Sequence, residues 1–157
     1  MSSSRAPWLA GVAAVFLAGG APPPPSGPTL LSPLEQTCIS SPFGPRGAAM
    51  HQGVDLAAPA GAWVRAAAAG TVLGIGRRGA AGLVVQLQHP DGSRTRYAHL
   101  GSVAPALAQG KRQVAAGERL GRVGRTGTAR GTHLHFELYL GGRAVDAAPF
   151  LALPRCG

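Results

Sequence analysis

Acidic residues and lysine are the scarcest features of this sequence. Only 6 of its 157 residues are Asp or Glu, against 15 that are Lys or Arg, and Lys111 is the one lysine. The net charge of +9 suits an anionic partner such as nucleic acid, acidic lipid or an acidic cell-wall polymer. Because the arginines are scattered and no aromatic residues are interleaved with them, the pattern favours a solvated basic surface over a nucleic-acid groove, and we predict no nucleic-acid partner.

Aromatic residues are also few, at 5%, and no internal repeat at a fixed period is visible. Glycine and proline are abundant instead, with 24 and 14 residues. This mixture favours short strands joined by tight turns over long helices. A length of 157 residues is enough for one domain with a real core and too short for two. We expect the protein to act as a monomer.

The first 21 residues have the features of an export signal. Arg5 supplies a positive start, residues 8–18 are apolar and uncharged, and small residues follow. The apolar run is too short to span a bilayer comfortably, and an uncleaved membrane anchor is the alternative. Residues 22–33 are a proline-rich linker, and residues 34–157 form the domain. We therefore predict export to the periplasm or cell envelope, without stable membrane association after export.

Two cysteines, Cys38 and Cys156, bracket the predicted domain. In the oxidising compartment that an export signal implies, we expect them to form a disulfide, with two unpaired thiols as the alternative. Closing a loop of that length stabilises the folded state by about 4 to 5 kcal/mol in the chain-entropy description.

Nearly all local signals in the domain indicate β-structure. Only residues 103–108 hint at a helical turn, and Pro90-Asp91-Gly92 is a turn sequence that makes a hairpin of the strands on either side of it. We therefore predict an all-β fold, a sandwich or open barrel of short antiparallel strands. Alternation with period two and bounding glycines place strands at residues 70–75, 83–88, 94–99, 113–124 and 133–140.

Two pairs of residues have the chemistry of metal ligands. His51 and Asp55 are four residues apart, so on an extended strand their side chains point to the same face. His133 and His135 also share one face of a strand, which then looks into a cleft or solvent. The opposite face of that strand is apolar and is predicted to face the core: Leu134, Phe136 and Leu138.

A catalytic zinc needs three protein ligands and an open position. His51, Asp55 and one of His133 and His135 make that count. The other histidine then lies beside the metal, where a general acid or base belongs. The fold is thus expected to include a cleft holding zinc.

The two remaining histidines differ in their setting. His99 ends the predicted hairpin strand, and for it a core or edge histidine satisfied by the backbone is the plain alternative. His89 precedes the turn sequence, so we expect it to be exposed at a loop tip and without a functional role.

Several motifs, in order and with suitable spacing, resemble those of the LytM/lysostaphin-type zinc metallopeptidases, peptidase family M23. Together they span nearly the whole predicted domain, and one departure is Ala147, where members often have proline. The matching segments are Ser41-Pro42-Phe43-Gly44-Pro45-Arg46, Met50-His51-Gln52-Gly53-Val54-Asp55-Leu56, Tyr97-Ala98-His99-Leu100, Val123-Gly124-Arg125-Thr126-Gly127 and Gly131-Thr132-His133-Leu134-His135-Phe136-Glu137.

The resemblance implies a role for each of five residues. Zinc would be held by His51, Asp55 and His135, with His99 and His133 beside it as catalytic residues. One of these two would move protons and the other would stabilise the oxyanion, and the resemblance does not assign the two roles between them. The implied substrate is the peptide part of bacterial peptidoglycan, whose free carboxylates suit a basic surface.

Two alternative functions fit this sequence less well. Some relatives lack the ligands and regulate other wall hydrolases, whereas this chain keeps all five positions. A lipoyl- or biotinyl-type carrier needs a lysine at a hairpin tip, and Lys111 has no such setting. Glu137 shares the face of His135, where it either orients that ligand or is an ordinary surface carboxylate.

Overall fold

The computed structural model describes residues 27–157, so the predicted export signal and residues 22–26 of the predicted linker lie outside the described residues. The elements, in chain order, are β1 (Ile39–Ser41), β2 (Gly44–Arg46), β3 (Ala49–His51), β4 (Val54–Ala57), β5 (Trp63–Arg65), β6 (Gly70–Arg77), the 3-10 helix η1 (Gly79–Ala81), β7 (Leu83–Gln88), β8 (Arg94–Val103), α1 (Pro105–Ala108), β9 (Gln113–Val114), β10 (Arg119–Val123), β11 (His133–Leu140), β12 (Arg143–Val145) and α2 (Ala148–Leu151).

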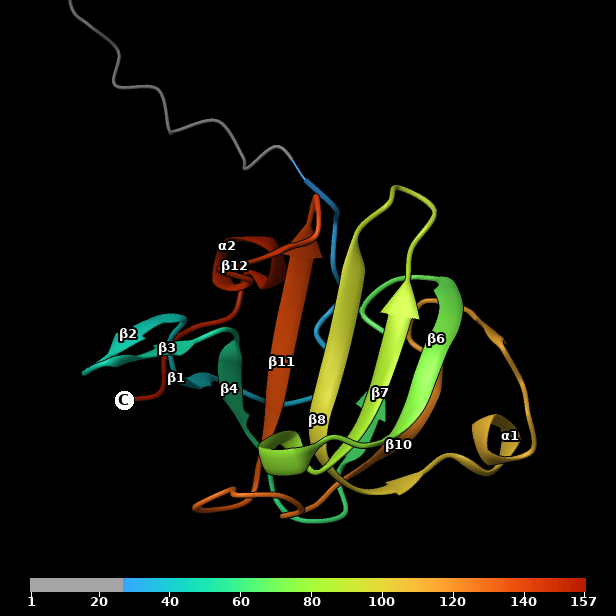
Figure 1. Cartoon of the computed structure of the whole chain (residues 1–157), viewed down its shortest axis with the longest axis horizontal. Helices are drawn as coiled ribbons and strands as arrows, with labels where there is room; N and C mark the ends of the chain where they lie inside the picture. Colours follow the sequence, from blue (N-terminus) through green and yellow to red (C-terminus); the bar gives the residue numbers. More distant parts are fainter. Residues whose placement is uncertain (1–26) are drawn as a thin grey trace, which may run out of the picture.

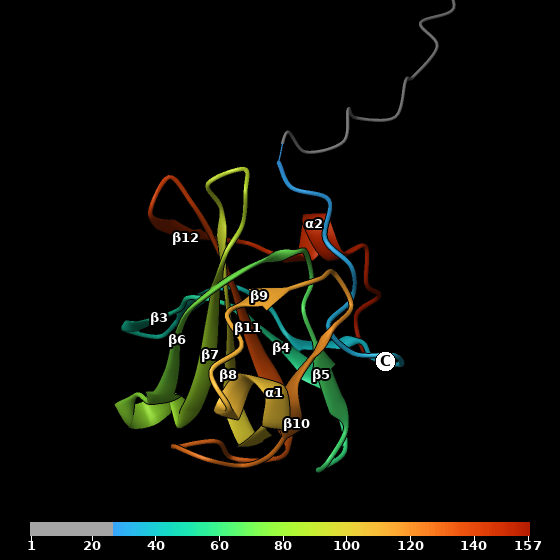
Figure 2. The same cartoon turned by 90° about the vertical axis from the view of Figure 1, so that its right-hand side faces the viewer.

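The strands confirm the predicted all-β fold. Ten of them form one sheet whose main path runs β1-β4-β11-β8-β7-β6-β9, and β2 and β3 form a separate hairpin (Figure 1). The long strand β8 pairs with β11 over Arg94–Ala98 and with β10 over Leu100–Val103. Because β10 in turn pairs with β5, the sheet bends away from its flat part, and β5 stands apart from β6 and β7 (Figure 2).

The core lies on one side of β11, as the alternation of this strand predicts. Leu134, Phe136 and Leu138 are completely buried. The ring of Phe136 meets that of Tyr97, on β8, edge to face with 5.3 Å between centroids. Side chains of β5, β6, β7 and β10 join the same cluster. One face of the sheet is thus filled, and its other face is left for the site.

The sequence predicted one of the helices that form in the described residues. The expected helical turn at residues 103–108 is α1, and a proline occupies its first turn, where the missing N–H costs nothing. The second helix, α2, and the short η1 were not predicted. In the described residues, no helix is long and apolar enough to cross a membrane.

The part of the predicted linker that is described lies against the domain. Leu30 is buried with the core, and the N–H of Leu31 donates to the carbonyl of Ala67 at 2.8 Å. The domain boundary at residue 34 stays a prediction. These contacts show that the chain already packs against residues 34–157 from Leu30 onward.

The prediction that His89 is exposed was wrong. Its side chain is only 4% exposed, with Nδ1 donating to the carbonyl of Ala69 at 2.8 Å. The reason is that His89, which directly follows β7, has its ring turned inward next to Gly70. A Cβ atom at Gly70 would lie 3.0 Å from that ring, so the glycine leaves the room that the imidazole needs.

His89 is one end of a buried chain of hydrogen bonds. Its Nε2 lies 2.8 Å from Oγ1 of Thr95, which lies 3.1 Å from the hydroxyl of Tyr97. The N–H of Ala67 donates to the same hydroxyl at 2.8 Å. Burial raises the pKa of Tyr97 to about 12, so its hydroxyl keeps its proton in this network. The chain ties β7 and β8 to the segment that enters β6.

We expect Tyr97→Phe to destabilise the protein by about 1 to 3 kcal/mol, because it leaves the buried amide of Ala67 without its side-chain partner and leaves the Thr95 hydroxyl with His89 alone. Urea unfolding measures the effect. Thr71→Val is the matched control, since it removes a hydroxyl from an exposed hydrogen bond and should cost less than about 0.5 kcal/mol. Equal stability of the two variants would contradict the role of the network.

Cys38 and Cys156 form the expected disulfide, which closes a loop of 118 residues in sequence. Backbone hydrogen bonds run beside it, from Ile39 N to the carbonyl of Pro154 at 2.8 Å and from Cys156 N to the carbonyl of Ile39 at 3.1 Å. The end of the chain is therefore held against β1 by both covalent and hydrogen bonds.

Removing this disulfide, as in Cys38→Ser with Cys156→Ser, is expected to lower the free energy of unfolding by about 2 to 5 kcal/mol, because the unfolded chain regains the freedom of a long loop. Denaturant unfolding of the oxidised protein and the double variant measures the difference. Adding a reductant to the double variant is the control and should change nothing. An unchanged midpoint on reducing the parent protein would refute the prediction.

Candidate metal centre

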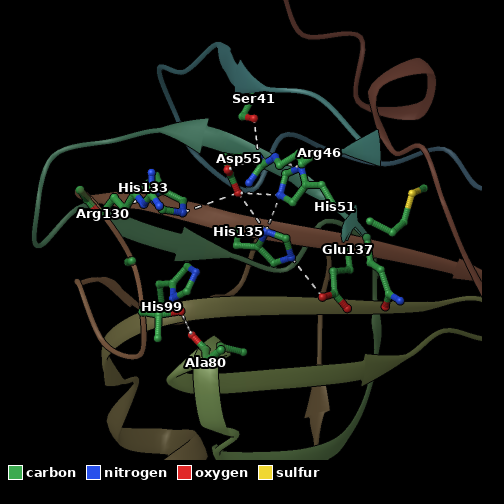
Figure 3. A pocket seen from close by; sticks show the side chains of 16 residues that line it. Ser41, Arg46, His51, Asp55, Ala80, His99, Arg130, His133, His135 and Glu137 are labelled. Atoms are coloured by element: carbon green, nitrogen blue, oxygen red, sulfur yellow. Dashed lines mark hydrogen bonds and ion pairs between the residues drawn. The ribbon is translucent and has the colours of Figure 1, made fainter. Parts of the chain in front are cut away.

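Three neighbouring strands bring the candidate site residues together. In the register of β4 against β11, Asp55 lies opposite His135, and in that of β11 against β8, His135 lies opposite Ala98. His99 follows Ala98 directly. Residues that are 80 positions apart in the sequence are thereby placed on one face of the sheet, as Figure 3 shows. They line an open pocket of about 600 Å³.

His51 reaches this face because of a tight turn between β3 and β4. Gly53 lies in that turn, pressed against β11. A Cβ atom at Gly53 would lie 2.4 Å from the carbonyl oxygen of Phe136 and 3.0 Å from Cε1 of His135. Only glycine allows this approach, which sets the imidazole of His51 beside that of His135, with 4.9 Å between ring centroids.

His51, Asp55 and His135 direct their ligand atoms at one point. Oδ1 of Asp55 lies 2.9 Å from Nδ1 of His135 and 3.1 Å from Nε2 of His51, and those two nitrogens are 3.1 Å apart. One imidazole nitrogen from each histidine and one carboxylate oxygen is a donor set typical of zinc, whose bonds to such atoms are about 2.0 to 2.2 Å long. Ligand atoms this close can share a single ion, so the residues fit zinc.

The outer atoms of the three side chains are each held by a neighbour. Nδ1 of His51 donates to the carbonyl of Pro42 at 2.6 Å, which leaves the lone pair of Nε2 for the metal position. Oδ2 of Asp55 accepts from Nη2 of Arg46 at 2.9 Å. These contacts direct one nitrogen of His51 and one oxygen of Asp55 inward, as metal ligands require.

Glu137 holds the third side chain. Its Oε1 accepts from Nε2 of His135 at 3.0 Å, so Nδ1 of His135 faces the metal position. Glu137 is only 5% exposed, and its other oxygen contacts the hydroxyl of Tyr139 and, at 3.1 Å, Nη1 of Arg96. The sequence left two alternatives for Glu137, a carboxylate that orients His135 or an ordinary surface carboxylate, and the structure shows the first.

His99 and His133 flank the three converging side chains. Nδ1 of His99 donates to the carbonyl of Thr126 at 2.7 Å, and Nδ1 of His133 to that of Gly131 at 3.2 Å. Their rings meet edge to face with 4.9 Å between centroids. Nε2 of His133 lies 3.5 Å from Oδ1 of Asp55. Among the described residues, the ligand atoms that all lie within 4.8 Å of one another are those of His51, Asp55 and His135, so His133 lies beside this set.

The backbone of His99 is strained. Its φ is +59°, in the left-handed region that a residue with a Cβ seldom adopts. Such a conformation costs on the order of 1 to 3 kcal/mol and is found preferentially at functional sites. Here the turn of the backbone brings the imidazole of His99 into the pocket, whereas Ala98 and Leu100 on either side are buried.

The electrostatics of the site favour a cation. Burial opposes the ionisation of Asp55, yet hydrogen bonds from His135 and Arg46 outweigh it and hold the pKa of this carboxyl well below its usual range. Burial also lowers the pKa of His135, but Asp55 and Glu137 raise it to about 9. The negative potential of these two carboxylates favours a positive charge at this place, either a proton on His135 or a metal ion. At His99, burial is the main cause of a lowered pKa.

Arg46 is the residue of this site that the sequence did not reveal. It lies within the motif around Phe43, but nothing in its spacing assigns it a partner. The pairing of β2 with β3 sets Gly44 opposite His51 and so carries Arg46 to the pocket edge, where its side chain is 48% exposed. A hairpin predicted over residues 44–51 would have been the signal.

Comparison with known proteins agrees with this geometry. The sequence profile of Peptidase family M23 matches residues 49–147. DD-carboxypeptidase/endopeptidase Mpg of Neisseria meningitidis is 42% identical over 130 residues, which are 79% of this chain and 29% of that protein. Peptidoglycan DD-endopeptidase ShyA of Vibrio cholerae is 38% identical over 116 residues, 69% of this chain and 26% of ShyA. A crystal structure of a zinc-containing peptidase from Vibrio cholerae superposes with a TM-score of 0.66 at 31% identity, covering 73% of this chain and 37% of that one.

The fold and the converging His, Asp and His side chains define a metallopeptidase-type domain. With the profile matching most of its length, this chain belongs to peptidase family M23. It spans less than a third of the two curated relatives, 29% of Mpg and 26% of ShyA.

Proposed function

We propose that this chain is a zinc-dependent endopeptidase that hydrolyses peptide bonds in peptidoglycan stem peptides or cross-bridges. The observation that carries the proposal is the meeting of His51, Asp55 and His135 at one point, all within 4.8 Å of one another, in a pocket that two further imidazoles share. The names of Mpg and ShyA, which describe peptidases and in one case peptidoglycan, supply the substrate class.

In this proposal His51, Asp55 and His135 hold the zinc. Bound there, zinc would supply Lewis acidity, which acidifies water and polarises a scissile carbonyl. Arg46 and Glu137 act through the ligands, because each engages the outer atom of one of them.

His99 and His133 are the proposed catalytic residues. With Nδ1 of each donating to a backbone carbonyl, Nε2 is the nitrogen left to each ring for chemistry. A neutral Nε2 accepts a proton from the attacking water, and the resulting imidazolium stabilises the oxyanion or protonates the leaving amine. The two rings are adjacent, so one can take the first role and its neighbour the second.

Location and partners follow from the same proposal. Peptidoglycan lies outside the cytoplasmic membrane, so residues 1–21 would serve as the export signal. The disulfide between Cys38 and Cys156 agrees with an oxidising compartment such as the periplasm. We propose a monomer without stable membrane association after export, acting on the peptide substrate alone.

Digestion of purified peptidoglycan by the full chain, with and without a zinc chelator, tests the proposal. Mass analysis of the products identifies the bond that is cut. We expect cleaved peptides that disappear with the chelator and return when zinc is added back. Intact peptidoglycan after treatment with zinc-loaded protein would instead favour a non-catalytic regulator of another wall hydrolase, or a different peptide substrate.

A further inference from the structure

A second groove adjoins the candidate metal centre, on the same face of the sheet. It has a volume of about 250 Å³ and is lined by strands β6, β7 and β8. Its residues form a row across the sheet in which Glu137 pairs with Arg96, Arg96 with Gln86, and Gln86 with Gly74. The row begins at Glu137, which contacts His135, so the groove continues the pocket of the metal centre away from that ligand.

Glycines keep the floor of this groove low. A Cβ atom at Gly76 would meet nothing within 4 Å, and one at Gly74 would lie 3.9 Å from Nη2 of Arg78. The guanidinium of Arg78 therefore extends over Gly74, in space that a side chain there would occupy. Val84 and Gln86 complete the floor.

The groove contains two guanidinium groups with few acceptors. Among residues 27–157, no hydrogen bond or ion pair engages the side chain of Arg78. Arg96 has one ion pair, to Glu137, and its Nε is a buried donor without a partner among the described residues. Because Glu137 is already shared with His135 and Tyr139, the groove keeps a surplus of positive charge and of N–H donors.

We propose that Arg78 and Arg96 form a subsite that binds a free carboxylate of the substrate peptide. Planar guanidinium groups match the two oxygens of a carboxylate, and the amide of Gln86 can add a further hydrogen bond. This inference rests on the proposed function, and it adds a preference for substrates that bear this carboxylate near the bond to be cut.

Strand geometry places the subsite close to the scissile bond. The distance from His135 to Glu137 along β11 is about 6.6 Å, and the distance from Glu137 to Arg96, across to the neighbouring strand β8, is about 4.8 Å. The backbone of Arg96 is thus about 8 Å from that of His135. Gln86, in the middle of the row, lies one strand further across, about 12 Å from His135, which is the length of about three to four extended residues. The recognised carboxylate therefore belongs to a residue within about three of the cleaved bond.

The test uses two cross-linked muropeptide dimers that differ only in whether the carboxyl next to the cross-link is free or amidated. We expect the full chain, loaded with zinc, to cleave the free acid with a kcat/KM at least about tenfold higher. Arg78→Gln should lose most of this preference, mainly through a higher KM for the acid, and Arg78→Lys should retain part of it. Arg77→Gln is the matched control, since Arg77 directly precedes Arg78 at the end of β6 and is also exposed but does not line the groove.

Each outcome separates the subsite from the activity itself. A parent protein that cleaves both dimers equally, or an Arg78→Gln variant that keeps the full preference, would overturn the subsite and leave the proposed function standing. A zinc-loaded parent protein that cleaves neither dimer would overturn the proposed function, and the subsite with it. Thermal unfolding of each variant confirms that the exposed substitutions leave the fold intact.

Discussion

Replacing Asp55 or His135 by alanine is expected to abolish zinc binding and peptidase activity together. Oδ1 of Asp55 and Nδ1 of His135 are 2.9 Å apart, and each would supply one of the three proposed ligand atoms. Two remaining ligands hold zinc poorly, and without the ion the pKa of the attacking water is not lowered. We expect activity to fall by at least about a thousandfold. Metal analysis of the purified variants and digestion of peptidoglycan measure the two losses.

Asp146→Ala is the control for charge, because Asp146 is an exposed carboxylate that caps the N–H of Ala148, far from the pocket lining. This variant should keep its zinc and its activity. An Asp55→Ala or His135→Ala protein that retained one zinc per chain would show that the metal is held elsewhere. Full activity without zinc would refute the metallopeptidase assignment itself.

Replacing His99 by alanine is expected to have the opposite pattern, in which zinc stays bound and turnover is lost. The His99 ring lies 5.9 Å from that of His135 between centroids, and among the described residues its side chain forms a hydrogen bond to the carbonyl of Thr126 and to none of the three proposed ligands. Loss of a positioned acid or base lowers kcat by about a hundredfold to ten-thousandfold. Zinc content and kcat, measured on the same preparation, distinguish this result from the loss of a ligand.

The left-handed backbone of His99 calls for a second variant. Alanine adopts a φ of +59° with difficulty, so His99→Ala can lose stability as well as activity. His99→Asn removes the imidazole while keeping a residue that tolerates this conformation. We expect His99→Asn to unfold at a temperature close to that of the parent and still to lose turnover. Activity preserved in His99→Asn would exclude His99 from catalysis.

Local strand and turn signals were enough to predict the all-β class, and the resemblance of short motifs was enough to indicate the family and the five polar residues of the candidate site. These features are local. The alternation of His133 and His135 with buried leucines and phenylalanine has a period of two, which is readable without a partner strand. The turn sequence after His89 likewise predicted the hairpin of β7 and β8, and these strands do pair antiparallel over Leu83–Gln88 and Arg94–Leu100.

The wrong prediction for His89 shows what a local sequence pattern cannot reveal. A histidine beside a turn is usually exposed, but the side chain of His89 points inward. Gly70 leaves space for its ring, and Ala69 and Thr95 supply its hydrogen-bond partners. Those partners come from other strands. No pattern within the segment itself contains that information.

The sequence alone thus determined which side chains are candidates for the proposed chemistry: His51 and Asp55 at a spacing of four, His133 and His135 at a spacing of two, and His99 at a strand end. The tertiary structure decided how they meet. Pairing of β4, β11 and β8 sets Asp55 opposite His135 and His99 beside them, and it recruits Arg46, Glu137 and the Arg78–Arg96 groove. The physical reason is that strand register is set by packing between segments distant in sequence, so the contacts that direct each ligand atom exist only once the sheet has formed.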